Sequence, residues 1–210
     1  PIHLGNITFP ETISQNEILT EELAQDKLEK LELDKTVIVS KAIKDSEIKI
    51  LLQELIYEYD INTDLEGINE HVPELLDNAR IHTVEPFYYM RCHYSKDKNY
   101  FDVAIGEVGL GIKNTLVKNS TYSYLRSEHH MRAISKAFEP MVSGKSESRG
   151  TGLSEVHDYF FDNKQHLLFL SSGDGYYLIK HENGDTQIQS GNLRYNLTGV
   201  QILLRFGCNR

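Results

Sequence analysis

The order of hydrophobic periods along the chain is the sequence feature that most restricts its fold. Apolar residues recur at helical spacing over residues 47–59 and 65–82, and two strand-like segments follow at 87–93 and 100–105. Residues 106–151 are predicted to be a long irregular stretch, rich in Gly, Ser, Lys and His, around one helical segment at 128–138. After a further helix from residue 152 come four short strand-like segments, at 166–170, 176–180, 186–190 and 200–206. Helices that come first and strands that gather last predict an α/β two-layer sandwich, with helices packed on one face of a mixed β-sheet.

Length and composition fit one globular domain with a modest appendage. The chain has 210 residues, of which 40% are hydrophobic, a content typical of globular proteins. Residues 16–33 show helical spacing with a strongly acidic outer face, and residues 36–40 resemble a short strand. We therefore expect an acidic helical segment with one strand over residues 1–60, and a single α/β domain over residues 61–210.

Net charge and hydropathy limit the kinds of partner that the chain is expected to have. The net charge of −9 argues against a general nucleic-acid coat, although residues 113–149 hold seven Lys and Arg against three Glu. No apolar run approaches the roughly 20 residues of a membrane span, and the first residues lack a signal pattern, so we expect a cytoplasmic chain with no membrane partner. Cys92 and Cys208 lie far apart, which indicates neither a disulfide framework nor a zinc site.

The first candidate site lies on the helix predicted over residues 65–82. At 100° per residue, Glu74, Asn78 and His82 line the border of one apolar stripe at successive turns, whereas Asp77 and Arg80 fall on the far side, toward solvent. The amide oxygen of Asn78 suits one position on Mg²⁺, and the carboxylate of Glu74 suits proton abstraction from water or a hydroxyl. Helix geometry alone also permits the simpler interpretation of three polar edge residues.

A second candidate follows the strand at residues 100–105. Glu107 stands at the end of that strand, with Gly109 and Gly111 after it. Glycines let the backbone approach a flat ligand closely, and a carboxylate at a strand end can accept a hydrogen bond from an exocyclic amine such as that of adenine. An ordinary turn is the alternative.

A third candidate precedes the helix that begins near residue 152. Gly150, Thr151 and Gly152 would direct backbone amides and the positive end of the helix dipole at an anion, with Lys145 as a mobile cation nearby. The Walker phosphate-binding motif is absent. A generic helix entry is the alternative.

The order of the three candidates resembles the GHKL superfamily of ATPases. Glu-x-x-x-Asn on a helix comes first, then carboxylate-x-Gly-x-Gly after a strand, then Phe-Glu-Pro, a lysine and Gly-Thr-Gly-Leu before a helix. This superfamily includes DNA gyrase B subunits, mismatch-repair ATPases, sensor histidine kinases and anti-sigma-factor serine kinases. The resemblance covers residues 65–206 and implies the Bergerat ATP-binding fold, with ATP and Mg²⁺ as cofactors.

The resemblance also implies roles for individual residues. Glu74 would be the catalytic base, Asn78 the magnesium ligand and Glu107 the carboxylate that reads adenine. The remaining residues would surround the nucleotide: His82, Gly109, Gly111, Lys145, Gly150, Thr151, Gly152 and Leu153. The Asn-Ala-x-x-His sequence that ends in His82 is nearest to the anti-sigma-factor kinase branch.

Two further features follow from the resemblance. The family nearly always has aspartate where this chain has Glu107, and the extra methylene must shift the carboxylate or the base. A lid is expected over about residues 107–151, where positive charge would close over a triphosphate. His129 and His130 are expected to be exposed residues of this lid.

Three functions remain open at this level. The first is a Mg-ATP-dependent ATPase domain that couples nucleotide binding to lid closure and a partner surface. The others are an anti-sigma-type serine/threonine protein kinase and a non-catalytic nucleotide-sensing module, while a gyrase-type role on nucleic acid is disfavoured by the charge. A protein partner, such as a STAS-like regulator, is expected by fold-level analogy. Three alternative roles stay open for residues 1–60: capping the sheet, forming a homodimer, or acting as a separate regulatory segment.

Overall fold

The computed structural model describes residues 18–19, 34–40, 43, 45–95, 98–143 and 152–209. Its strands are β1 (Ile18–Leu19), β2 (Asp34–Ser40), β3 (Phe87–Ser95), β4 (Tyr100–Glu107), β5 (Leu167–Glu182) and β6 (Asp185–Gly207). Its helices are α2 (Asp45–Glu58), α3 (Leu65–His82), α4 (Gly111–Leu116), the 3₁₀ helix η2 (Ser120–Ser127), α5 (His130–Ala137) and α6 (Gly152–Asp162).

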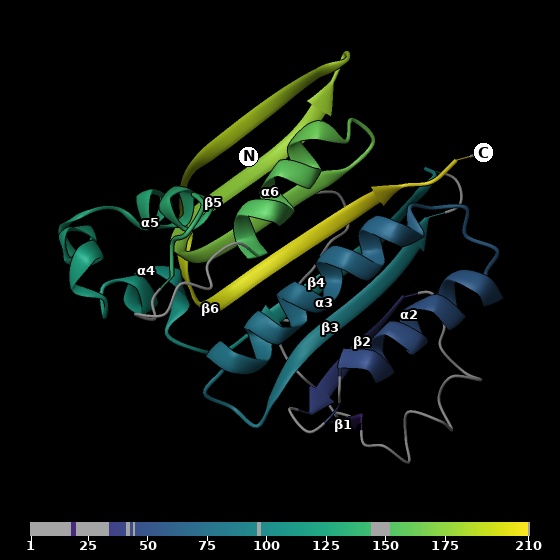
Figure 1. Ribbon diagram of the computed structural model, residues 1–210, viewed down its shortest axis with the longest axis horizontal. Helices are drawn as coiled ribbons and strands as arrows, with labels where there is room; N and C mark the ends of the chain where they lie inside the picture. The colour runs from purple at the N-terminus through teal and green to yellow at the C-terminus, as the bar shows by residue number, and fades with distance from the viewer. Residues whose placement is uncertain are drawn as a thin grey trace.

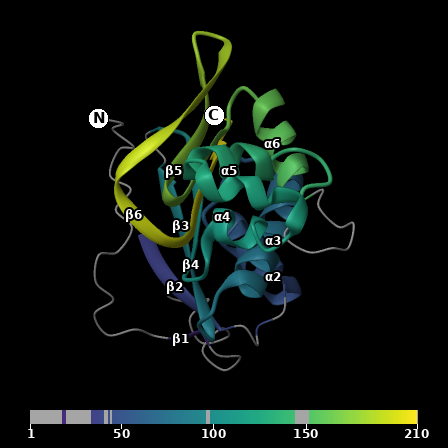
Figure 2. The ribbon, with the colours of Figure 1, turned by 90° about the vertical axis from the view of Figure 1, so that its left-hand side faces the viewer.

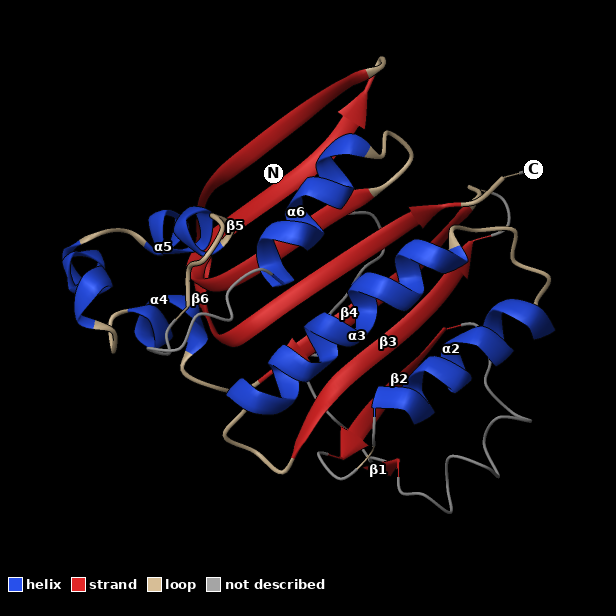
Figure 3. Cartoon of the chain, viewed as in Figure 1, coloured by secondary structure: helices blue, strands red, loops and turns tan. Residues whose placement is uncertain are grey.

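One mixed sheet forms the first layer of the fold. Its strand order is β1-β2-β3-β4-β6-β5, in which β1 runs parallel to β2 and all other neighbours are antiparallel. The helices form the second layer and all lie on the same side of the sheet (Figures 1, 2 and 3). The predicted two-layer α/β sandwich is therefore confirmed.

The side chains that β4 directs toward the helical layer belong to the main hydrophobic core. On β4, Phe101, Val103 and Ile105 point to the helical layer and are almost completely buried. They pack into one cluster with the apolar stripe of α3, namely Val72, Leu75, Leu76 and Ala79. Because successive side chains of a strand point to opposite faces, this register also places Glu107 on the helical side of the sheet.

Helix α3 carries the first candidate site, and its start is defined by a side-chain cap. The backbone N–H of Gly67 donates to Oδ1 of Asp64 at 2.9 Å, which satisfies one of the amides left free at a helix start. The hydroxyl of Tyr159 on α6 donates to the other carboxylate oxygen of Asp64. Asp64 thus orients α3 relative to α6, the helix that holds the third candidate site.

We expect Asp64→Ala to lower the free energy of unfolding by about 1–2 kcal/mol, because the cap and the Tyr159 contact are both lost. Urea unfolding followed by circular dichroism would measure the change. Glu66→Ala is the matched control, since it removes an exposed acid from the same turn of the helix. Equal stability of the Asp64 variant and the control would show that the cap does not stabilise α3.

The end of β6 is tied to the start of α3. The backbone N–H of Asn209 donates to the carbonyl oxygen of Asn62 at 2.8 Å, and Thr63 forms an isolated antiparallel bridge with Cys208. The Thr63 hydroxyl also donates to the carbonyl of Gly207 at 3.3 Å. These contacts join the last described residues to the turn just before the Asp64 cap.

Three predicted elements differ from the structure. Residues 106–151 were expected to hold one helical segment in a long irregular stretch, but α4, η2 and α5 occupy most of residues 111–137. The four late strands merge into two long ones, β5 and β6, with irregular register between Ser172 and Gly175. The helix predicted over residues 16–33 is wrong at Ile18–Leu19, which pair as a strand with β2, and the rest of that segment lies outside the described residues.

Tertiary contacts account for these differences. Gly111 opens α4 at a φ of +72°, a conformation suited to glycine, and the backbone N–H of Ile112 donates to the Ser172 hydroxyl at 2.9 Å. Because this contact involves a residue far away in the sequence, it produces no hydrophobic periodicity within the six residues of α4. Among the described helices, none has both the length and the apolar character required to cross a membrane.

Candidate functional site

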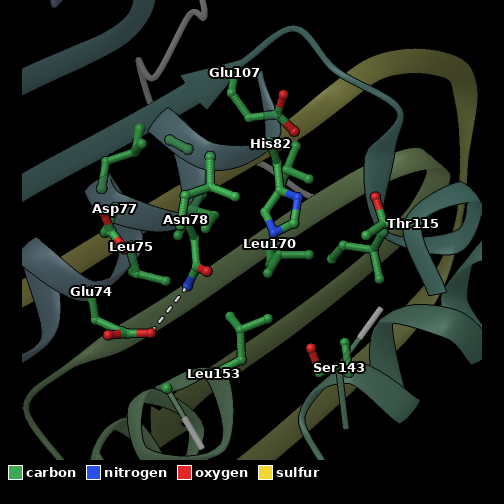
Figure 4. A pocket seen from close by; sticks show the side chains of 18 of the residues that line it. Glu74, Leu75, Asp77, Asn78, His82, Glu107, Thr115, Ser143, Leu153 and Leu170 are labelled. Atoms are coloured by element: carbon green, nitrogen blue, oxygen red, sulfur yellow. Dashed lines mark hydrogen bonds between the residues drawn. The ribbon is translucent and has the colours of Figure 1, made fainter. Parts of the chain in front are cut away.

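A cavity of about 690 Å³ lies between the sheet and helices α3, α4 and α6 (Figure 4). This volume falls within the roughly 300–1,000 Å³ typical of small-molecule sites. The predicted site residues that line it are Glu74, Asn78, His82, Glu107, Gly111, Gly152 and Leu153. Members of all three candidate segments, distant in the sequence, therefore surround one space.

The polar edge of α3 forms one wall of this cavity. Glu74, Asn78 and His82 lie on successive turns, as their spacing predicts, and the Asn78 side-chain N–H donates to Oε1 of Glu74 at 3.4 Å. The expectation that Asp77 faces away toward solvent is wrong, because Asp77 also lines the cavity while pairing with Arg80. The cavity therefore contacts a wider part of the α3 surface than the edge formed by Glu74, Asn78 and His82.

Glu74 sits in surroundings that strengthen it as a base. Burial raises the pKa of its carboxyl group, and the neighbouring carboxylates of Asp77 and Glu155 raise it further, against the opposing hydrogen bond from Asn78. A carboxylate with a raised pKa accepts a proton more readily. Glu74 is thus suited to receive a proton from a water or hydroxyl in the cavity.

The start of α6 packs directly against Glu74. A Cβ atom placed on Gly152 would lie 1.9 Å from Oε1 of Glu74, so a larger residue here would displace the Glu74 side chain. Leu153 and Glu155 from the same turn also line the cavity. Lys145, Gly150 and Thr151, the other predicted members of this segment, lie outside the described residues.

Glu107 has the most unusual surroundings of the cavity residues. Its side chain is only 3% exposed, and within the described part of the chain neither carboxylate oxygen has a hydrogen-bond partner. Burial raises its pKa to about 7, and the nearby backbone N–H of Val200 acts in the opposite direction. Figure 4 shows the carboxyl group beside His82, across the cavity from Glu74.

The two glycines after Glu107 serve different purposes. Gly111 lines the cavity at the start of α4, and a Cβ there would lie 2.7 Å from the Ser172 hydroxyl. Gly109 is not part of the cavity wall. A Cβ on Gly109 would lie 2.3 Å from the carbonyl oxygen of His82 and 2.5 Å from Oε2 of Glu107, so this glycine lets the backbone pass tightly against both residues.

Charge on the described wall is predominantly negative. The wall contains Glu74, Asp77, Glu107 and Glu155 together with His82, and no Lys or Arg among the residues that the structure describes. The described cations of the expected lid lie elsewhere: the Lys113 ammonium donates to the Glu128 carbonyl at 2.6 Å. Positive charge at the cavity therefore has to come from a bound ion or from residues outside the described ranges.

Sequence reasoning missed several residues of the wall. Thr115 on α4 and Ser143 after α5 place hydroxyl groups at the cavity, and Ile105, Leu170 and Ile202 on three strands form its apolar floor. The floor residues carried a signal, since they occupy inward positions of predicted strands. Thr115 and Ser143 carried none, because each depends on how the segment over residues 111–143 folds.

The chemistry of the donors fits a magnesium ion that also binds phosphate. Within the described ranges, no group of three or more His, Cys, Asp or Glu side chains is arranged to hold a metal ion. Mg²⁺ needs only one or two protein oxygens when phosphates and waters complete its coordination. The amide oxygen of Asn78 meets that requirement, since its hydrogen bond to Glu74 uses the amide nitrogen.

Comparisons with known proteins include a similarity to a solved structure. No protein-family model matches the chain, and no curated protein matches it. Among solved structures, it is similar to a topoisomerase IV ATP-binding domain of Francisella tularensis in complex with a small-molecule inhibitor, with a TM-score of 0.36 and 17% identity. The match covers 85% of this chain and 43% of that structure.

Proposed function

We propose that this chain is an ATP-binding domain of the GHKL type, which takes up ATP with Mg²⁺ in the cavity beside α3. The observation that carries the proposal is the buried carboxyl group of Glu107, which has no partner within the described protein and borders an apolar-floored cavity. A buried carboxyl group without a partner is costly unless a ligand supplies one. An adenine base, flat and bearing an exocyclic amine, suits that position.

The opposite side of the cavity suits the phosphates. Glu74 would accept a proton from the attacking group, and Asn78 would hold the magnesium ion through its amide oxygen. Bound magnesium would neutralise charge on the phosphate oxygens. The glycine at position 152 keeps the start of α6 close enough for its backbone to face the same space.

We expect ATP binding to depend strongly on magnesium, because the described wall presents four carboxylates and no Lys or Arg. Isothermal titration calorimetry with Mg-ATP and with ATP in EDTA should show a loss of affinity of at least about tenfold without the metal. Adenosine, which lacks phosphate, is the control and should bind equally in both buffers. Absence of ATP binding up to millimolar nucleotide would reject the proposed function.

The acceptor of the γ-phosphoryl group separates two forms of the proposal. Glu74 would activate water in an ATPase, or a side-chain hydroxyl of a partner protein in an anti-sigma-type serine/threonine kinase. Incubation with γ-labelled ATP and candidate partners, such as STAS-like regulators, distinguishes the two. Label that appears as free phosphate indicates hydrolysis, and label on protein indicates a kinase.

A non-catalytic nucleotide-sensing module is the second candidate. It is favoured by Glu107, whose longer side chain stands where the family nearly always has aspartate. In this role, nucleotide binding would shift the part of the expected lid that holds α4, η2 and α5 and so alter a partner surface, without turnover. Binding without measurable phosphate release, unchanged in a Glu74 variant, would support it.

A further inference from the structure

The carboxyl group of Glu107 can present two different hydrogen-bonding patterns to a ligand. When protonated, it offers an O–H donor beside a carbonyl acceptor, and when ionised it offers two acceptors. Neither oxygen has a hydrogen-bond partner among the described residues, and the nearby backbone N–H of Val200 lowers the pKa by less than burial raises it. The protonation state of Glu107 therefore determines which hydrogen-bonding edge of a ligand it can pair with.

The two common purines differ in this respect. Adenine presents an amino donor next to a ring-nitrogen acceptor, which matches a protonated carboxyl group. Guanine presents a ring N–H next to an amino group, two donors that match an ionised carboxylate. A mismatched edge leaves buried polar atoms unpaired, and such mismatches produce strong discrimination between similar ligands.

We propose that Glu107 makes the purine preference of this cavity depend on pH, with adenine nucleotides favoured when its carboxyl group is protonated and guanine nucleotides when it is ionised. The inference rests on the proposed function, because it concerns the nucleotide in the same cavity. The extra methylene that distinguishes glutamate from aspartate supports it, because a longer reach favours direct two-point contact with the base edge.

The surroundings of Glu107 allow it to change state near neutral pH. Burial raises its pKa to about 7, so both states are populated in the physiological range. Among the residues that the structure describes, the other titratable groups of the cavity wall are His82, Glu74 and Asp77 on α3 and Glu155 on α6. The segments from α4 and β6 contribute no titratable side chain to the wall.

Calorimetric titration of the full chain with Mg-ATP and Mg-GTP at about pH 6 and about pH 8.5 tests the inference. If only the protonated form binds adenine, the affinity for ATP should fall about 30-fold between these conditions, while the affinity for GTP rises about tenfold. The ratio of the two dissociation constants is the readout, because phosphate ionisation affects both nucleotides alike. Glu107→Gln is the matched variant, since its amide is a permanent donor beside an acceptor and should keep the ATP preference at both pH values.

The outcomes separate this inference from the proposed function. If ATP binds and the ratio is the same at both pH values, the inference is wrong while the proposed function stands. If the ratio changes equally in Glu107→Gln, another group such as His82 controls it, and the inference is again wrong. If neither nucleotide binds at either pH, the proposed function itself fails.

Discussion

Replacing Glu107 with glutamine is expected to raise the free energy of unfolding by about 3 kcal/mol above pH 7 and to leave it almost unchanged near pH 4. The carboxyl group has a pKa of about 7 in the folded chain against an ordinary value of 4.5. Between these values the folded state holds a proton that the unfolded state has released. Stability therefore falls as pH rises from about 4.5 to about 7, and it stays lower above that range.

Glutamine removes this pH-dependent cost because it cannot ionise. The difference of about 3 kcal/mol follows from about 1.4 kcal/mol for each pH unit by which the pKa rises. For a chain of this size the melting temperature should increase by roughly 6–12 °C at pH 8. Glu54→Gln, an exposed position on α2, is the control and should show no such gain. Equal pH profiles for wild type and Glu107→Gln would mean that Glu107 is ionised at little cost in the fold.

Replacing Glu74 with glutamine should reduce the rate of γ-phosphoryl release by about 10²- to 10⁴-fold while changing the affinity for Mg-ATP little. Glutamine keeps the size of the side chain and a carbonyl oxygen for Asn78 but cannot accept the proton. A loss confined to kcat indicates an interaction made only in the transition state. Phosphate release under single-turnover conditions, with binding followed separately by calorimetry, measures both quantities.

A matched variant on the same helix controls for this experiment. Glu70→Gln removes an exposed carboxylate one turn before Glu74 and should retain full activity. If Glu74→Gln and Glu70→Gln release phosphate at the same rate, Glu74 is not the base, and the non-catalytic module becomes the better explanation. If Glu74→Gln fails to bind Mg-ATP at all, its role is in binding rather than in proton transfer.

Hydrophobic periodicity predicted the parts of the fold in which apolar residues recur at a constant spacing over several helical turns. Helix α3 begins and ends at the predicted residues because its apolar stripe runs unbroken against the sheet and Thr83 stops it at the C-terminal end. Strands β3 and β4 begin at the residues predicted for them, and each extends two residues beyond its predicted end. Short helices could not be found in this way, because α4 is positioned by the contact between Ile112 and Ser172, which lie 60 residues apart.

The shared position of Glu74, Asn78 and His82 on α3 was predictable, whereas the electrostatics of the cavity were not. Spacing placed Glu74, Asn78 and His82 on one edge, and their common cavity could be expected once the sheet was assumed. The burial of Glu107 could not, because it depends on Gly109 and Gly199 bringing backbone segments against it from two directions. Likewise, the position of Asp77 on the wall depends on the width of the cavity, and this width cannot be derived from the spacing of residues around a helix.

The junction between the end of β6 and the start of α3 has a mechanical consequence. Because Asn209 and Gly207 bond to the turn at Asn62 and Thr63, a pull on the carboxyl end of the chain is transmitted to the first turn of the helix that carries Glu74. Backbone groups make most of the hydrogen bonds at this junction. A force applied through a tether or a neighbouring module joined there would thus act on the helix that carries the candidate base Glu74, which lies 135 residues before Asn209 in the sequence.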